Sequence, residues 1–130
     1  MLVVDDDPDI LDGLRALLED TYDVLVAANG REALELLARE PVDALLLDLM
    51  MPGVNGEAVL RELAQRPAAP PAIVISARAD GHDVARALGA MACLTKPFEV
   101  ERLEETLARV IAGGGGGGGP GALPPGAPPP

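Results

Sequence analysis

The sequence predicts an α/β domain in which five parallel strands form one doubly wound sheet. Two observations predict it: short apolar runs alternate with segments of helical periodicity, and this alternation repeats five times along the chain. Parallel strands need crossover connections, and helical crossovers leave helices on both faces of the sheet. We therefore expect a single core, with the strands buried between two layers of helices.

The five apolar runs are too short for helices, and most are rich in branched residues. In chain order they occupy residues 1–4 (MLVV), 24–27, 44–47 (ALLL), 72–75 (AIVI) and 92–94. Continuous apolar runs, rather than alternating ones, are typical of strands that are covered by helices on both faces. Each run is therefore predicted to be a strand of the sheet.

Between these runs, apolar residues recur at helical spacing and predict five helices. The apolar stripes occupy residues 10–18, 33–37, 59–63, 84–88 and 100–111. Asp7 and Pro8 give the first helix an N-cap followed by proline at the first helical position. Pro41 and Pro67 fall just beyond the second and third helices, where proline ends helical structure.

The last 18 residues, 113–130, differ in composition from everything before them. They hold 9 of the 15 glycines and 6 of the 13 prolines, and they carry no charge. Such a segment buries too little apolar surface to offset its chain entropy, so we expect it to be disordered. The folded domain is therefore predicted to span residues 1–112.

Charge and composition narrow the class of protein. The formal net charge is -11, which argues against direct binding to nucleic acid because phosphate backbones are held by an excess of Lys and Arg. No apolar run approaches the roughly 18 residues that span a bilayer, and no secretory leader precedes the first strand. Cys93 is the single cysteine and has no internal disulfide partner. We expect a cytoplasmic protein without a membrane partner.

Polar side chains follow four of the five predicted strands. Asp5 and Asp6 end the first strand, Asp48 the third, Ser76 the fourth and Lys96 the fifth. In an open parallel sheet, sites form beyond the carboxyl ends of the strands. The sequence therefore predicts one site that combines three carboxylates, a hydroxyl and an ammonium.

Three carboxylates at close range repel one another, and a hard divalent cation such as Mg²⁺ relieves the repulsion. A carboxylate beside the metal can attack phosphorus as a nucleophile. Lys96 would neutralise charge on the phosphoryl oxygens and Ser76 would donate to one of them. The chain contains nine arginines and a single lysine, Lys96. This exception indicates that the position requires the compact ammonium of lysine rather than a guanidinium. Taken one at a time, these motifs also fit a helix cap or a turn; their convergence favours a site.

In chain order, the segments VVDDD, LLLDLMMPGVNG, ISA and LTKPF resemble the CheY-like receiver domain of two-component response regulators over residues 1–112. The resemblance implies a flavodoxin-like (βα)5 fold with strand order 2-1-3-4-5. It also implies a cis peptide bond between Lys96 and Pro97. The implied roles are Asp48 as phosphoacceptor, Ser76 and Lys96 as phosphoryl contacts, and Asp5, Asp6, Asp48 and the Met50 backbone carbonyl as Mg²⁺ ligands.

The same resemblance implies how the protein works. A sensor histidine kinase, or a phosphotransfer protein, would donate a phosphoryl group from phosphohistidine to Asp48, and slow self-hydrolysis would follow. The domain would be no enzyme beyond its own phosphorylation and dephosphorylation. It would present a phosphorylation-dependent surface to a downstream protein that the sequence does not identify, and homodimerisation stays open.

Two departures from the family pattern bear on signal output. Cys93 replaces the aromatic residue usual three positions before the lysine, and the interval from Ser76 to Lys96 is about two residues short, which predicts a trimmed fourth helix. An interaction module independent of phosphorylation is therefore one alternative, and a receiver within a longer regulator or hybrid kinase is another. A phosphatase with an aspartyl nucleophile is disfavoured because position 50 is Met rather than Asp. We expect His82 to be a solvated loop residue and Cys93 a small buried apolar group.

Overall fold

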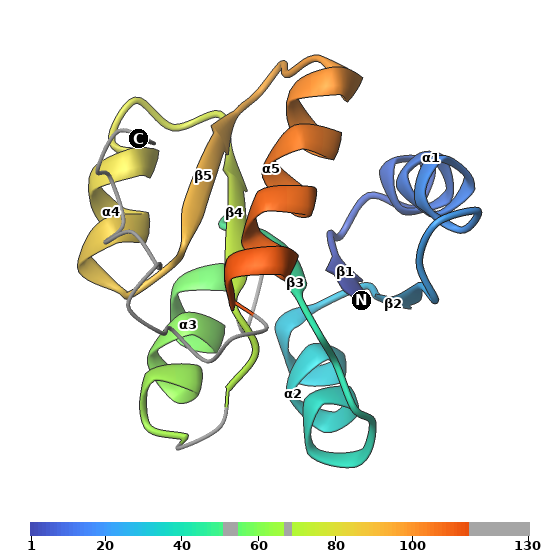
Figure 1. Ribbon diagram of the computed structural model, residues 1–130. Helices are drawn as coiled ribbons and strands as arrows, with labels where there is room; N and C mark the ends of the chain where they lie inside the picture. Colours follow the sequence, from blue (N-terminus) through green and yellow to red (C-terminus); the bar gives the residue numbers. More distant parts are fainter. Residues whose placement is uncertain (51–54, 67–68, 115–130) are drawn as a thin grey trace.

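The computed structural model describes residues 1–50, 55–66 and 69–114 of the chain. Strands and helices alternate through this part of the molecule (Figure 1). In order, they are β1 (Leu2–Val4), α1 (Pro8–Leu18), β2 (Leu25–Ala27), α2 (Gly30–Arg39), β3 (Leu45–Asp48), α3 (Gly56–Ala64), β4 (Ala72–Ser76), α4 (Gly81–Ala87), β5 (Ala92–Thr95) and α5 (Val100–Gly114). The five predicted strands are all present, and their ends lie within one residue of the predicted positions.

The strands form one five-stranded parallel sheet in the order β2-β1-β3-β4-β5, so the predicted architecture is confirmed. The register places Val4 of β1 beside Leu47 of β3, and Asp48 beside Ile75 of β4. Because all five strands point the same way, the residues that end them share one edge of the sheet.

Two hydrophobic clusters fill the space between the sheet and its helices. On one face, α2, α3 and α4 pack against alternate strand residues, such as Leu45 and Leu47 of β3. On the other face, α1 and α5 pack against residues such as Leu46. Every residue of β1, β3 and β4 is buried, which explains why these strands appear in the sequence as continuous apolar runs.

Side-chain caps fix where several helices begin, next to the carboxyl edge of the sheet. The Asp7 carboxylate accepts a hydrogen bond from the Asp9 N–H at 2.9 Å, and Pro8 follows at the first helical position, as predicted. Asn29 and Asn55 cap α2 and α3 in the same way. The caps at Asp7 and Asn29 hold the ends of the loops that follow β1 and β2, and the cap at Asn55 fixes the start of α3.

The short α4 needs an abrupt connection to β5. It holds seven residues and is the shortest of the described helices. The trimming relative to the family pattern stays a prediction. Gly89, directly after its cap, adopts a φ of 87°, a left-handed conformation that glycine reaches without a Cβ penalty. The chain can therefore turn back into the sheet within a few residues.

Two sequence expectations differ from the structure, and two others concern residues that the structure does not describe. α5 continues to Gly114, two residues past the predicted end of the domain at 112, because the first glycines of the run still extend the preceding amphipathic helix. His82 lies in the first turn of α4 and not in a loop. Pro67 and the predicted tail from 115 onward fall outside the described residues.

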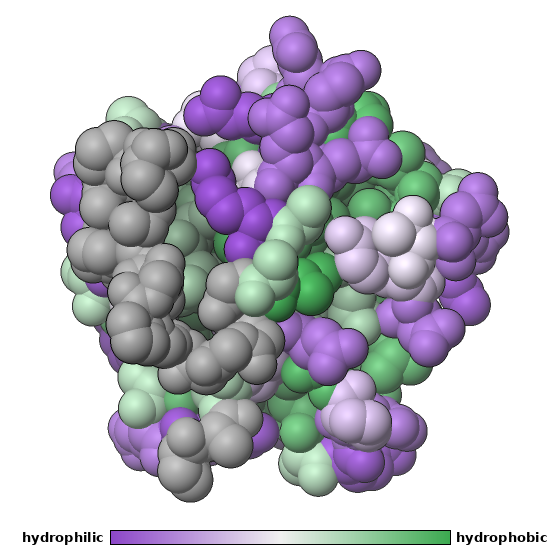
Figure 2. Space-filling view, in the orientation of Figure 1, coloured by the Kyte–Doolittle hydropathy of each residue, from purple (hydrophilic) through white to green (hydrophobic). Residues whose placement is uncertain are grey.

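The viewed surface is mixed in hydropathy. Figure 2 shows hydrophilic side chains along the upper, right and lower edges of this face, with hydrophobic residues between them. Within the described ranges, no helix combines the length and apolarity that crossing a membrane requires.

Candidate functional site

Three carboxylates meet at the carboxyl edge of the sheet. Asp5 and Asp6 follow β1, Asp48 ends the neighbouring β3, and each offers an oxygen that lies within 4.8 Å of the others. Asp5 and Asp48 are buried, at 2% and 5% exposure, whereas Asp6 is exposed. The structure thus brings together three of the residues that the sequence selected, with an opening to solvent on the Asp6 side.

The surroundings of Asp5 disfavour the charged form of its carboxyl group. Burial is the largest influence and raises the pKa of the Asp5 carboxyl. The hydrogen bond from the Asp7 N–H, at 2.9 Å, opposes the rise, and the charge of Asp48 adds to it. The protein therefore keeps a carboxylate where the charged form is disfavoured, which is the electrostatic setting that a bound cation would correct.

Lys96 supplies a positive charge between two of the carboxylates. Its Nζ lies 3.5 Å from Asp5 Oδ2 and 3.6 Å from Asp48 Oδ2. Its backbone N–H donates to the Ser76 carbonyl at 2.9 Å, which fixes the end of β5 against β4. The peptide bond between Lys96 and Pro97 is cis, as the resemblance implied.

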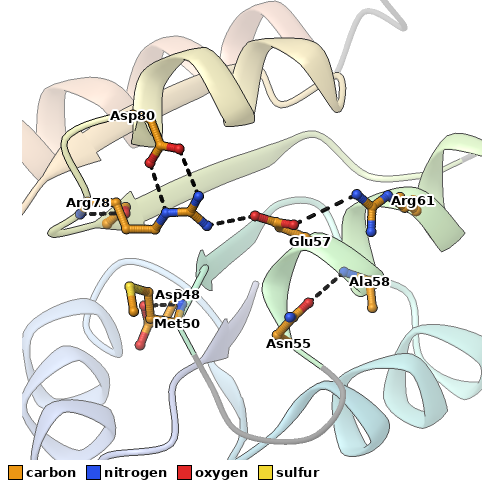
Figure 3. Close-up of polar contacts among 9 residues, drawn as sticks. Asp48, Met50, Asn55, Glu57, Ala58, Arg61, Arg78 and Asp80 are labelled. Carbon is orange, nitrogen blue, oxygen red and sulfur yellow. Dashed lines mark hydrogen bonds and ion pairs between the residues drawn. The ribbon is translucent and has the colours of Figure 1, made fainter.

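The two oxygens of Asp48 have different surroundings. Oδ1 accepts a hydrogen bond from the Met50 N–H at 3.0 Å (Figure 3), whereas Oδ2 faces Lys96. Met50 itself is 57% exposed. The metal-ligand role expected for the Met50 carbonyl stays a prediction.

Ser76 is buried at the end of β4, at 1% exposure. Its Oγ accepts a hydrogen bond from the Arg78 N–H at 3.0 Å. Gly81, the first residue of α4, packs directly on this side chain: a Cβ at Gly81 would lie 3.0 Å from Ser76 Oγ. The hydroxyl is therefore held by its own turn and by the start of α4.

The structure also contains a charged group beside the site that sequence reasoning missed. Arg78 forms a two-point pair with Asp80, at 2.8 Å for each contact, and a 2.7 Å pair with Glu57 of α3 (Figure 3). The hydrogen bonds from Arg78 lower the pKa of the Asp80 carboxyl. Arg78 and Glu57 lie 21 residues apart, so no local periodicity could have paired them. The one signal in the sequence was that Arg78 follows Ser76 closely and Glu57 follows Asp48, which places both residues after strands that end at the site.

His82 and Cys93 have surroundings that the sequence did not fully predict. His82 is exposed, as expected, and its Nε2 lies 3.0 Å from the hydroxyl of Thr95, so the histidine also links α4 to the end of β5. Cys93 is half-buried, not fully buried, and burial raises the pKa of its thiol. It lines a cavity of about 340 Å³, together with Pro97 and Phe98, between β5 and the start of α5.

The donor set suits a hard cation. Three carboxylates without sulfur or imidazole form the kind of site that Mg²⁺ prefers, since Mg²⁺ binds through one or two carboxylates and retains several waters. A partly free carboxylate with an ammonium 3.6 Å away can also act as a nucleophile toward an electrophile that carries negative oxygens.

Comparison with known proteins gives a consistent result. The response regulator receiver domain matches residues 1–108. The response regulator MprA of Mycolicibacterium vanbaalenii is 42% identical over 115 residues, which are 86% of this chain and 48% of that protein. The chain thus spans about half the length of the curated relatives it matches.

Solved structures agree with the sequence matches. The signal receiver domain of a signal transduction histidine kinase from Syntrophus aciditrophicus has a TM-score of 0.78 at 32% identity, over 86% of this chain and 89% of that one. A CheY-like response regulator receiver domain protein from Methanospirillum hungatei has a TM-score of 0.82 at 28% identity, over 90% and 96%.

Proposed function

This chain belongs to the response regulator receiver domain family, and from that premise we propose that Asp48 accepts a phosphoryl group in a Mg²⁺-dependent reaction. Receiver domains are signalling modules of two-component systems. The observation that carries the specific proposal is the position of Asp48, which lies within 4.8 Å of two other carboxylates and 3.6 Å from the only lysine of the chain.

Asp5, Asp6 and Asp48 would hold the Mg²⁺, with the Met50 carbonyl as a further ligand. When bound, the metal would neutralise charge on the carboxylates and on the phosphoryl oxygens. Asp48 would attack phosphorus through one carboxylate oxygen, while its other oxygen keeps a fixed partner. The Met50 N–H, which donates to Oδ1 at 3.0 Å, supports this division between the two oxygens.

Lys96 and Ser76 would bind the phosphoryl group. Lys96 lies between Asp5 and Asp48, so its ammonium is placed to pair with an oxygen of a group attached to either side chain. The Ser76 hydroxyl retains its proton for donation, because its oxygen acts as the acceptor for the Arg78 N–H. Burial of the Asp5 and Asp48 carboxylates reduces the screening of these interactions by water.

The expected phosphoryl donor is the phosphohistidine of a sensor histidine kinase or of a phosphotransfer protein, and the expected output is a surface that a downstream protein recognises after phosphorylation. Residues 1–112 would form the receiver domain. The curated relatives are about twice as long as the aligned segment, which supports a receiver that works within a longer regulator as one version of this proposal.

Acetyl phosphate with Mg²⁺ tests the proposal. Intact-mass measurement should show the gain of one phosphoryl group, and the gain should vanish in Asp48→Ala. Asp43→Ala, which removes an exposed carboxylate five residues earlier, is the matched control and should label like the parent protein. Absence of labelling in the parent at any Mg²⁺ concentration, or labelling that persists in Asp48→Ala, contradicts the assignment.

The half-buried Cys93 favours a second candidate, a receiver-like interaction module that works without phosphorylation. A small thiol lacks the ring whose rotation would report the state of Asp48, so output by that route is weakened. A partner isolated from the source organism should bind equally with and without a phosphoryl mimic if this candidate is correct. A tenfold change in affinity would exclude it.

A further inference from the structure

Arg78 connects the turn that holds Ser76 to a different part of the fold. The turn lies between β4 and α4, and the Arg78 side chain reaches from it to Glu57 in the first turn of α3 (Figure 3). The closest approach is 2.7 Å, between Arg78 Nη1 and Glu57 Oε1. Both side chains are partly buried, at 32% and 22% exposure, so water screens this pair less than a fully exposed one.

The two ion pairs of Arg78 have different mechanical consequences. Asp80 belongs to the same turn, so the pair between Arg78 and Asp80 moves with the turn as one body. Glu57 belongs to α3, whose first residue, Gly56, donates its N–H to the Leu49 carbonyl just after Asp48. The pair between Arg78 and Glu57 therefore resists movement of the turn relative to Asp48.

Movement of the Ser76 hydroxyl is tied to this turn. Its oxygen accepts the Arg78 N–H at 3.0 Å, and Gly81 lies against its other side. The strand end itself is fixed, because the Ser76 carbonyl accepts the Lys96 N–H. A shift of the hydroxyl toward a group on Asp48 must therefore break the hydrogen bond to Arg78 or carry the Arg78 backbone along, which changes the position of Arg78 relative to Glu57.

From these contacts we propose that Glu57 and Arg78 form a latch that holds Ser76 in its unphosphorylated position. Arg78 is then a positioning residue that acts through Ser76. The proposal rests on the proposed function of Asp48 and deepens it: phosphorylation works against the latch, and the latch lowers the affinity of the site for a phosphoryl group. By linkage, breaking the latch favours the phosphoryl-bound state.

Beryllofluoride, a tetrahedral phosphoryl mimic, is the probe, and its affinity in the presence of Mg²⁺ is measured by NMR titration. Glu57→Gln should bind it about two- to fivefold more tightly than the parent at low salt, the range that a partly exposed ion pair supplies. The gain should shrink toward unity at about 1 M salt, where the pair is screened. A merely structural role for Glu57 would not produce this salt dependence.

Glu62→Gln is the matched control, because it makes the same substitution on α3 and breaks a 3.8 Å pair with Arg66 that does not contact the turn. Its affinity should equal that of the parent. In an Arg78→Gln background, Glu57→Gln should have no further effect.

Several outcomes overturn the latch alone: parent-like or weaker binding by Glu57→Gln, an equal gain in Glu62→Gln, or a gain that persists in the Arg78→Gln background. A parent protein that binds no beryllofluoride would overturn the proposed function and the latch with it.

Discussion

At the scale of single residues, the carboxylate cluster is a compromise between stability and chemistry. One ammonium, Lys96, lies 3.5 Å and 3.6 Å from the carboxylates of Asp5 and Asp48. Asp6 adds a third negative charge at the same edge, so the group keeps a negative excess. Burial still raises the pKa of Asp5 despite the ammonium. A domain selected only for stability would replace such a group with apolar residues, so its presence supports a function that needs it.

Cys93 gives a residue-scale prediction that depends on pH. Because burial raises its pKa, alkylation of the folded protein by iodoacetamide should reach half its maximal rate at a higher pH than alkylation of the urea-unfolded chain. The sign for stability follows from linkage: the contribution of the neutral thiol is fully present below the unfolded-state pKa and is lost as the pH rises through the folded-state value.

Rate profiles against pH, followed by intact mass, measure both states. Cys93→Ser is the blank, since it removes the only cysteine of the chain. Coincident profiles for the folded and unfolded protein would contradict the inferred burial of the thiol.

At the scale of elements, the start of α3 determines where Asp48 lies. Gly56 packs so closely on the end of β3 that an added Cβ would lie 2.7 Å from the Cα of Leu49 and nearer still to the Asp48 carbonyl. Those neighbours are backbone atoms, which cannot rotate away. The helix and the strand are therefore held together at the one point where the carboxylate leaves the sheet.

Gly56→Ala should accordingly destabilise the domain by about 1–3 kcal/mol, the usual effect of overpacking, and slow the labelling of Asp48. Gly13→Ala is the matched control, because an added Cβ at this position in α1 would meet no atom within 4 Å. It should stabilise the domain by about 0.5–1 kcal/mol through its helix propensity. Urea unfolding of the three proteins measures both effects, and equal stabilities would refute the argument.

Most of the strands and helices were predictable because two local signals, the apolar pattern and the helix caps, agree on where these elements lie. The apolar runs of β1, β3 and β4 are continuous since these strands are buried on both faces, and caps such as Asp7 mark helix starts directly. The end of α5 was predicted less well, because glycine at 113–114 is unfavourable in a helix by intrinsic propensity and only the preceding turns carry it on. Strand order came from the resemblance and not from periodicity.

The carboxylate cluster was predictable from the sequence, whereas the contacts of its neighbours Arg78 and His82 were not. Residues that end parallel strands share one edge, so Asp5, Asp48 and Lys96 could be grouped from topology alone. The pairing of Arg78 with Glu57, and of His82 with Thr95, depends on how loops and helix starts approach one another. No period in the sequence encodes that approach, and these contacts required the structure.

At the scale of the whole molecule, the formal charge of -11 opposes compaction, and the carboxylate cluster concentrates part of that repulsion at one edge. Added salt screens the general repulsion, and any salt of the same ionic strength does so equally. Mg²⁺ should do more, because it binds the folded site and adds the free energy of that binding to the stability of the domain. The two effects separate when they are compared at matched ionic strength.

We therefore expect MgCl2 to raise the Tm above the value in NaCl of equal ionic strength. At a Mg²⁺ concentration about tenfold above its Kd, binding adds about 1.4 kcal/mol, which corresponds to roughly 5 °C for a domain of this size. Asp6→Asn should lose most of this excess, because it removes the exposed carboxylate of the cluster without disturbing the buried pair. Asp9→Asn, an exposed carboxylate of α1, should keep it. Equal Tm values in the two salts would mean that the cluster binds no Mg²⁺, and the negative excess at this edge would then need another explanation.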